Sequence, residues 1–138
     1  MKRMRKLLAC LCMAALVALT AAGCGSDKPY KTVQEYLDDN SNDLSAFEKA
    51  FEGTGMKLSI TAEGSKLVYT AQYEVQLPVD DSNKAEIEAS LKESMEGQKS
   101  NMEETLEGLK ELIDDKNVSI VFRYLNMDGT EIYSGEFK

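Results

Sequence analysis

Histidine and tryptophan are absent from this sequence of 138 residues, and cysteine occurs only three times. Without histidine, neither a Ser-His nor a Cys-His pair can be assembled, so hydrolysis by a histidine-containing triad is excluded. Cys10 and Cys12 lie in an apolar N-terminal segment, and Cys24 is the only cysteine after it. If that segment is removed, no internal disulfide can form, and the fold must depend on its hydrophobic core.

The N-terminal segment has the layout of a secretory signal, because four basic residues among the first six precede an apolar run over 7–19. At about 13 residues the run is shorter than the roughly 20 that a membrane-spanning helix needs. The sequence "AAG" before Cys24 resembles a bacterial lipobox, with Ala21 where Leu is usual. We therefore expect a signal peptide over 1–23, a diacyl group on Cys24 and a tether over 24–31. The alternative is an ordinary secretory signal followed by an incidental cysteine.

Acidic residues dominate the rest of the chain. Residues 24–138 contain 12 basic and 24 acidic residues, a formal charge of −12. Such a surface repels nucleic-acid phosphates and anionic lipid headgroups. Nucleic acid is therefore not an expected partner, and the membrane is expected to be reached through the lipid on Cys24. The length suits one domain, which we place at 32–138.

Helical spacing appears in two regions. Thr32 and Glu35 have the spacing of a capping box, and a second short helix ends near Gly53, with a polar linker over 38–43 between the two. Farther on, apolar residues recur at steps of three and four. They predict one long amphipathic helix over 83–115, continuous through Gly97. The alternative is a kink or break near 97–100, where Ser100 and Glu103 could cap a restarted helix.

Alternating apolar residues predict two hairpins, over 58–77 and 118–138. The fold class is therefore α+β, in two layers, with a four-stranded, mainly antiparallel sheet carrying helices on one face in the order α-β-β-α-β-β. The turns "EGSKL" and "DGTEI" match in residue type. This match leaves two readings open: the hairpins are a duplicated unit, or they share only what any turn requires.

Acidic side chains raise two possibilities, a metal site and an enzyme site. In "DDNSNDLSAFEK", Asp38, Asn40 and Asn42 take ligand positions of a calcium loop, but Asp43 replaces its glycine and Lys49 its closing glutamate. We therefore expect neither a metal nor a cofactor. The many carboxylates leave one enzymatic alternative, a carboxylate-dependent enzyme acting on cell-wall glycans. Most of these acids lie off the apolar helix stripe, where a solvated surface is expected.

The sheet face directed away from the helices offers the one candidate binding surface. On that face we expect an apolar patch with a single cation, since Arg123 is the only arginine after the leader. Arg123 could recognise an anionic group, or pair with Glu74 or Glu136 across strands, and the pair is the favoured reading. The candidate partner-binding residues are Val68, Val121, Arg123, Leu125 and Ile132.

The leader, "TVQEYL" and "FRYLNMDGTEIYSGEF" together resemble a family of small Gram-positive bacterial lipoproteins that carry a single domain of unknown function. The resemblance implies location and architecture but no chemistry. We expect a non-catalytic domain anchored by lipid on the extracytoplasmic face of the cell membrane, where it binds a protein, a peptide or an envelope component.

Overall fold

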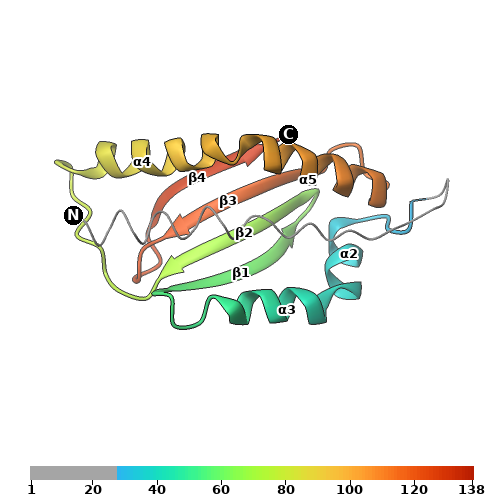
Figure 1. Cartoon of the computed structure of the whole chain (residues 1–138), viewed down its shortest axis with the longest axis horizontal. Coiled ribbons are helices and arrows are strands. Elements are labelled where there is room, and N and C mark those ends of the chain that lie inside the picture. Colours follow the sequence, from blue (N-terminus) through green and yellow to red (C-terminus); the bar gives the residue numbers. More distant parts are fainter. Residues whose placement is uncertain (1–27) are drawn as a thin grey trace.

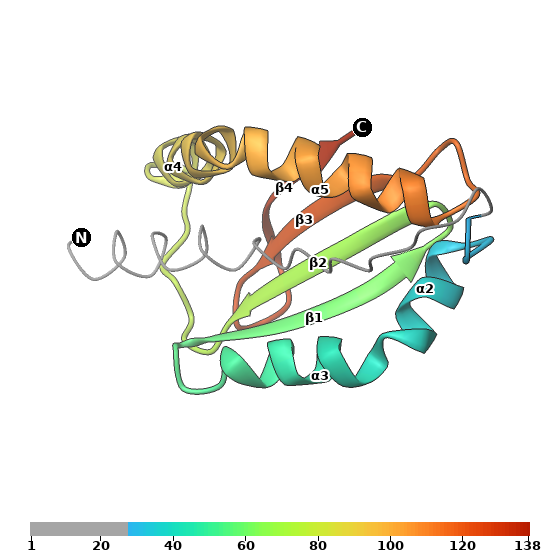
Figure 2. The ribbon, with the colours of Figure 1, turned by 45° about the vertical axis from the view of Figure 1, so that its right-hand side comes forward.

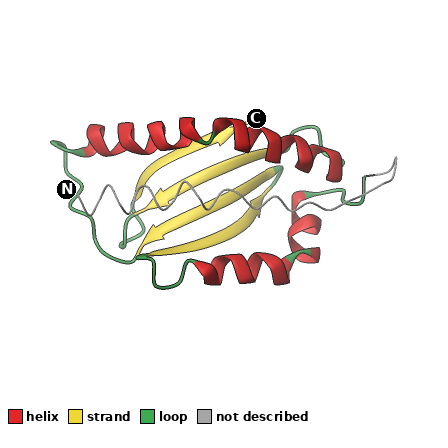
Figure 3. Cartoon of the chain, in the orientation of Figure 1, coloured by secondary structure: helices red, strands yellow, loops and turns green. Residues whose placement is uncertain are grey.

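A computed structural model describes residues 28–138, so the predicted signal peptide and Cys24 lie outside the described residues. Figures 1 and 3 show helices packed against one sheet. In chain order the elements are α2 (Val33–Asp39), α3 (Ser41–Ala50), β1 (Met56–Glu63), β2 (Lys66–Tyr73), α4 (Lys84–Gly97), α5 (Lys99–Leu112), β3 (Ser119–Leu125) and β4 (Glu131–Phe137). The predicted α+β class is confirmed, with a pair of helices in each predicted helical region.

The four strands form one mixed sheet in the order β1-β2-β3-β4. Both hairpins are antiparallel, whereas the central strands β2 and β3 are parallel. If the second hairpin were a copy of the first, shifted by two strands along the sheet, β3 would be parallel to β1 and antiparallel to β2. The two halves share the order α-α-β-β, but such a shift does not relate them.

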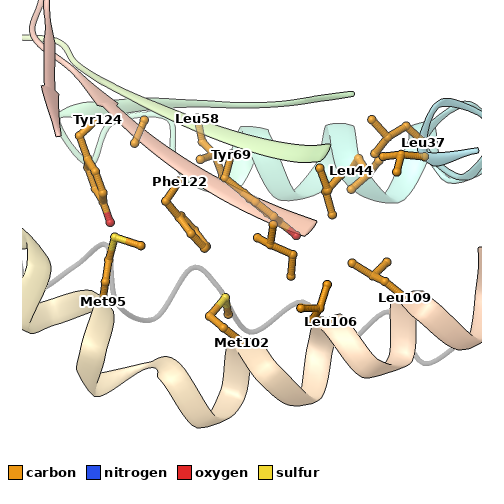
Figure 4. Packing of buried hydrophobic residues seen from close by; sticks show 14 of the residues in the cluster. Leu37, Leu44, Leu58, Tyr69, Met95, Met102, Leu106, Leu109, Phe122 and Tyr124 are labelled. Atoms are coloured by element: carbon orange, nitrogen blue, oxygen red, sulfur yellow. The ribbon is translucent and has the colours of Figure 1, made fainter. Parts of the chain in front are cut away.

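The helices cover the inner face of the sheet in two groups. α2 and α3 pack against β1, while α4 packs against β4 and α5 against β3 and β4, as Figure 2 also shows. One core cluster joins buried side chains from all four helices and all four strands. In Figure 4, Tyr69 and Phe122 point from the sheet toward the helix that carries Met102 and Leu106. The Tyr69 and Phe122 rings are stacked with centroids 5.0 Å apart.

The connection between the first two helices is shorter than the polar linker that the sequence predicted. Thr32 begins α2 as expected, because its hydroxyl accepts a hydrogen bond from the Glu35 N–H at 3.1 Å. Asn40 is the single residue between α2 and α3. Its side-chain amide donates to the Tyr36 carbonyl at 2.8 Å, so it satisfies the end of α2 where α3 begins. The residues of the predicted linker are therefore mostly helical.

The favoured prediction of one continuous helix over 83–115 is wrong, because the helix breaks at Gln98 into α4 and α5. The alternative of a break near 97–100 is confirmed, with Gln98 and not Ser100 between the two helices. A straight helix over 83–115 would extend about 50 Å, whereas strands of seven or eight residues extend only about 25 Å. Because of the break, Met95 before it and Met102 after it both lie over the sheet. Their exposed fractions are 8% and 1%. Gly97 supplies the weak point.

The edge of the sheet at β1 is closed by a side chain of α3. The Glu48 carboxylate accepts a hydrogen bond from the Ile60 N–H at 2.8 Å. An edge strand with free N–H groups can pair with another chain, and covering it with a helix or a charged side chain prevents this. Within residues 28–138, no helix has the length and apolar character needed to cross a bilayer.

Candidate functional site

The outer face of the sheet buries two valines that do not belong to the main core. Val68 is fully buried and Val121 is 8% exposed, yet neither is part of the core cluster. The register places Thr61, Val68 and Val121 side by side on β1, β2 and β3. Because side chains alternate along a strand, these residues face away from the core. Something other than the helix layer must therefore cover them.

An ion pair spans three strands on this face, and from the strand register we infer that it provides this cover. The Arg123 guanidinium donates to both carboxylate oxygens of Glu63, at 3.3 and 3.2 Å. Glu63 lies on β1 opposite Lys66, and Arg123 lies on β3 opposite Thr70. The line between them therefore crosses β2 at Val68, whose side chain is shielded by the two long stems. Arg123 thus pairs with Glu63, whereas Glu74 or Glu136 was expected.

A second pair crosses the sheet beside the first. Lys66 Nζ lies 3.9 Å from Glu136 Oε1, and the Ser119 hydroxyl donates to the same oxygen at 2.7 Å. We call Glu63, Lys66, Arg123 and Glu136 the outer lid. The Arg123 hydrogen bond and charge lower the pKa of Glu63. The Ser119 hydrogen bond, aided by the Lys66 charge, lowers the pKa of Glu136. Both carboxylates are therefore stabilised in their ionised form.

The five candidate residues of the outer face do not form the exposed patch that alternation suggested. Val68, Val121, Arg123 and Leu125 share the face, but Leu125 is the only apolar member that is half-exposed. Ile132 lies in the core cluster, 4% exposed. Tyr124 pairs with Tyr133 and Leu125 with Glu131, so Ile132 is the extra residue of a bulge. A bulge redirects its side chain, and the expected outward orientation of Ile132 is corrected accordingly.

The two ends of the sheet differ in what they carry. We call the end where residues 28–32, 64–65 and 113–118 lie the entry end, and the opposite end, with residues 51–55, 74–83 and 126–131, the far end. At the entry end the chain is fixed as it joins the domain. The Tyr30 N–H donates to the Leu112 carbonyl at 3.0 Å, and the Asp114 N–H donates to the Tyr30 carbonyl at 2.7 Å. Tyr30, inside the predicted tether, therefore packs on the domain.

At the far end, hydrogen bonds join the segment after β2 to the turn between β3 and β4. Asn126, 3% exposed, accepts from the Leu77 N–H at 2.8 Å and donates to the Leu77 carbonyl at 2.9 Å. The Gln72 amide donates to the Met127 carbonyl at 3.0 Å. We call these bonds the Asn126 clamp. The alternation in the sequence predicted that β2 would continue to Leu77, but the strand ends at Tyr73. The Asn126 clamp fixes the segment between Tyr73 and Leu77.

Among residues 28–138, the only buried polar or charged residues are Ser119 and Asn126, so no described carboxylate is buried. Nor do these residues contain three or more acidic or cysteine side chains grouped as metal ligands. Five described carboxylates have a shifted pKa, and in each of them hydrogen bonds lower it. Burial raises the pKa of Tyr69 and Tyr73 to about 12, so both hydroxyls stay protonated at neutral pH.

Residues 33–137 match the model of a family described as a domain of unknown function, DUF4854. The match covers most of the chain, and the protein therefore belongs to this family. It agrees with the single domain that the sequence predicts. Comparison with curated proteins gave no match, and comparison with solved structures gave none either.

Proposed function

We propose that this protein is a lipid-anchored, extracytoplasmic domain without catalytic activity that binds a protein, a peptide or an envelope component. The observation that supports this proposal best is the attachment of Tyr30 at the entry end, six residues after Cys24. Six residues extend at most about 20 Å. A lipid on Cys24 would keep the entry end near the membrane surface and turn the far end away from it.

The proposal also fits the charge of the domain. A formal charge of −12 over residues 24–138 does not favour adsorption to anionic lipid, so a covalent lipid is the more effective means of attachment. Two acyl chains give a lasting anchor, since each buried methylene contributes about 0.8 kcal/mol. The carboxylate-dependent enzyme remains the alternative prediction, and no described feature favours it over binding.

Replacement of Cys24 tests the anchor. In cells that express the full chain, Cys24→Ser should prevent lipid attachment and processing before residue 24, so the protein should no longer have the lipidated mass or fractionate with the membrane as wild type does. Cys12→Ser is the matched control, because it makes the same change inside the leader and should leave mass and location unaltered. A Cys24→Ser chain that stays in the membrane pellet at the wild-type mass would refute the anchor.

A further inference from the structure

The far end carries both of the large hydrophobic side chains that are exposed within residues 28–138. Val75 is 53% exposed and Met127 is 56% exposed. Single exposed apolar residues are ordinary on a protein surface. Here, however, Val75 lies on one and Met127 on the other of the two segments that the Asn126 clamp joins. Figures 1 and 2 show the end of β2 and the turn between β3 and β4 close together in both views.

The three segments of the far end carry charge of one sign, and the nearest lysines in the chain, Lys49, Lys57 and Lys84, lie just outside them. These three segments contain six acidic residues and no lysine or arginine, whereas the segments of the entry end contain three lysines and two aspartates. The difference between the ends is local, because both belong to the same acidic domain. A surface with exposed apolar groups among carboxylates is complementary to a partner that is both apolar and cationic. The acidic residues are Glu52, Glu74, Asp80, Asp81, Asp128 and Glu131.

The clamp fixes the backbone that presents these side chains. The Asn126 side chain is buried and makes two hydrogen bonds to Leu77, which itself lies in the core, while its Oδ1 also accepts from the Met127 N–H at 3.0 Å. Gln76 and Asp128 add a further pair, in which the Asp128 N–H donates to Gln76 Oε1 at 3.1 Å. Loops held in this way lose little conformational entropy when a partner binds. The exposed side chains therefore stand on a preorganised base.

The geometry points to the far end as a docking surface for a cationic peptide segment with apolar side chains. The inference rests on the proposed function, since it names the partner chemistry of a domain proposed to bind. Val75 and Met127 supply the apolar contact, and the surrounding carboxylates select positive charge. An anionic membrane is disfavoured as the occupant by the same carboxylates.

The test uses the purified full chain in detergent and three synthetic peptides. In the first peptide lysine alternates with leucine, in the second lysine alternates with serine, and in the third glutamate alternates with leucine. Only the first should bind well, and its affinity should fall as salt is added. Combining Val75→Ser with Met127→Ser should weaken binding by about tenfold or more, as expected for the loss of central apolar contacts. Fluorescence anisotropy measures each affinity.

A matched pair of charge variants separates a local site from general attraction to an acidic protein. Combining Glu74→Gln, Asp81→Asn and Glu131→Gln removes three charges at the far end. Combining Glu104→Gln, Glu107→Gln and Glu111→Gln removes three from the exposed side of α5. The first variant should weaken the lysine-leucine peptide several-fold, and the second should leave it nearly unchanged. Equal weakening of peptide binding by both variants would overturn the inference. An unchanged affinity after the serine substitutions at Val75 and Met127 would overturn it as well.

Two further outcomes are distinguishable. If the wild-type chain self-associates and the serine substitutions at Val75 and Met127 abolish this, the occupant is a second copy and the cationic partner is wrong. Sedimentation measures that directly. The peptide assay does not depend on the lipid, so it can fail while the Cys24→Ser result still supports the anchor. Conversely, a failed anchor would leave the peptide result standing.

Discussion

The inner and outer faces of the sheet both exclude water from apolar side chains, but they do so by different means. On the inner face, Phe122 and Tyr69 pack against helices that belong to a continuous core. On the outer face, Val68 and Val121 are buried outside the core cluster, and we infer from the strand register that the four charged side chains of the outer lid cover them. The inner face is held by a large apolar area, and the outer face by a thin layer of stems and ion pairs.

This difference means that burial alone does not reveal how firmly a residue is held. Phe122 and Val121 are both 8% exposed, although one lies in the core cluster and the other outside it. Exposed ion pairs contribute little free energy, so the lid can open at small cost. Removal of a core side chain leaves a cavity that the helices cannot fill. Three substitutions of decreasing expected effect test this contrast.

The largest effect is expected on the inner face. Phe122→Ala should lower the free energy of unfolding by about 3–5 kcal/mol, because it removes a ring packed between sheet and helices and leaves a cavity. Urea unfolding of the full chain, followed by circular dichroism, measures the change. Phe47→Ala on α3 is the matched control, since Phe47 is only partly buried and should cost clearly less. Equal losses for the two variants would show that Phe122 is not a core residue.

An intermediate effect is expected under the outer lid. Val68→Thr keeps the shape of the side chain but buries a hydroxyl, which should cost about 1–3 kcal/mol if the lid excludes water. The same change at exposed Val75 should stay within about 0.5 kcal/mol. In a chain that also carries Arg123→Gln, the cost of Val68→Thr should fall, because water then reaches the hydroxyl. A neutral Val68→Thr variant would mean that the lid admits water.

The smallest effect is expected from the ion pair itself. Arg123 lowers the pKa of Glu63 in the folded chain. The resulting stabilisation is therefore present above the ordinary carboxylate pKa and is lost as pH falls through the lowered folded value. Arg123→Gln should be slightly less stable than wild type near pH 7, and this difference should shrink near pH 3. In an NMR titration, the Glu63 pKa should rise in the Arg123→Gln variant, and an unchanged pKa would contradict the pair.

Much of the fold can be predicted from periodicity in the sequence. Alternation predicted both hairpins, and the glycines at their turns, Gly64 and Gly129, adopt the positive φ values of 61° and 85° that such turns favour. Periodicity says which side of a strand is buried but not which strand lies next to it. The parallel pairing of β2 with β3 was therefore not predicted, although the helical connection between these two strands is the kind that parallel neighbours require. Gly97 marks where the helix can break, but whether it breaks depends on the length of the sheet beneath it, which no local pattern contains.

The candidate outer face was predictable only in part. Alternation placed Val68, Val121 and Arg123 on one side, and β2 and β3 do bring them together. Their burial depends on the register of three strands, which decides that Glu63 and Arg123 meet over Val68. Ile132 was misplaced because one bulge residue changes the face that alternation assigns. The exposure of Val75 was not predicted, because alternation carried on to Leu77 placed Val75 on the buried face, whereas β2 ends at Tyr73.

The parallel pair at the centre of the sheet also determines the order in which the chain can assemble. The hairpins close over connections of two and five residues, whereas β2 and β3 are separated by residues 74–118. Each doubling of a flexible connection adds about 0.6 kcal/mol to the entropy cost of closing it. The two hairpins should therefore form first and the central pair last. Until β3 has arrived, β2 is an apolar edge without its neighbour, so the first half of the chain should not persist as a folded unit without the second.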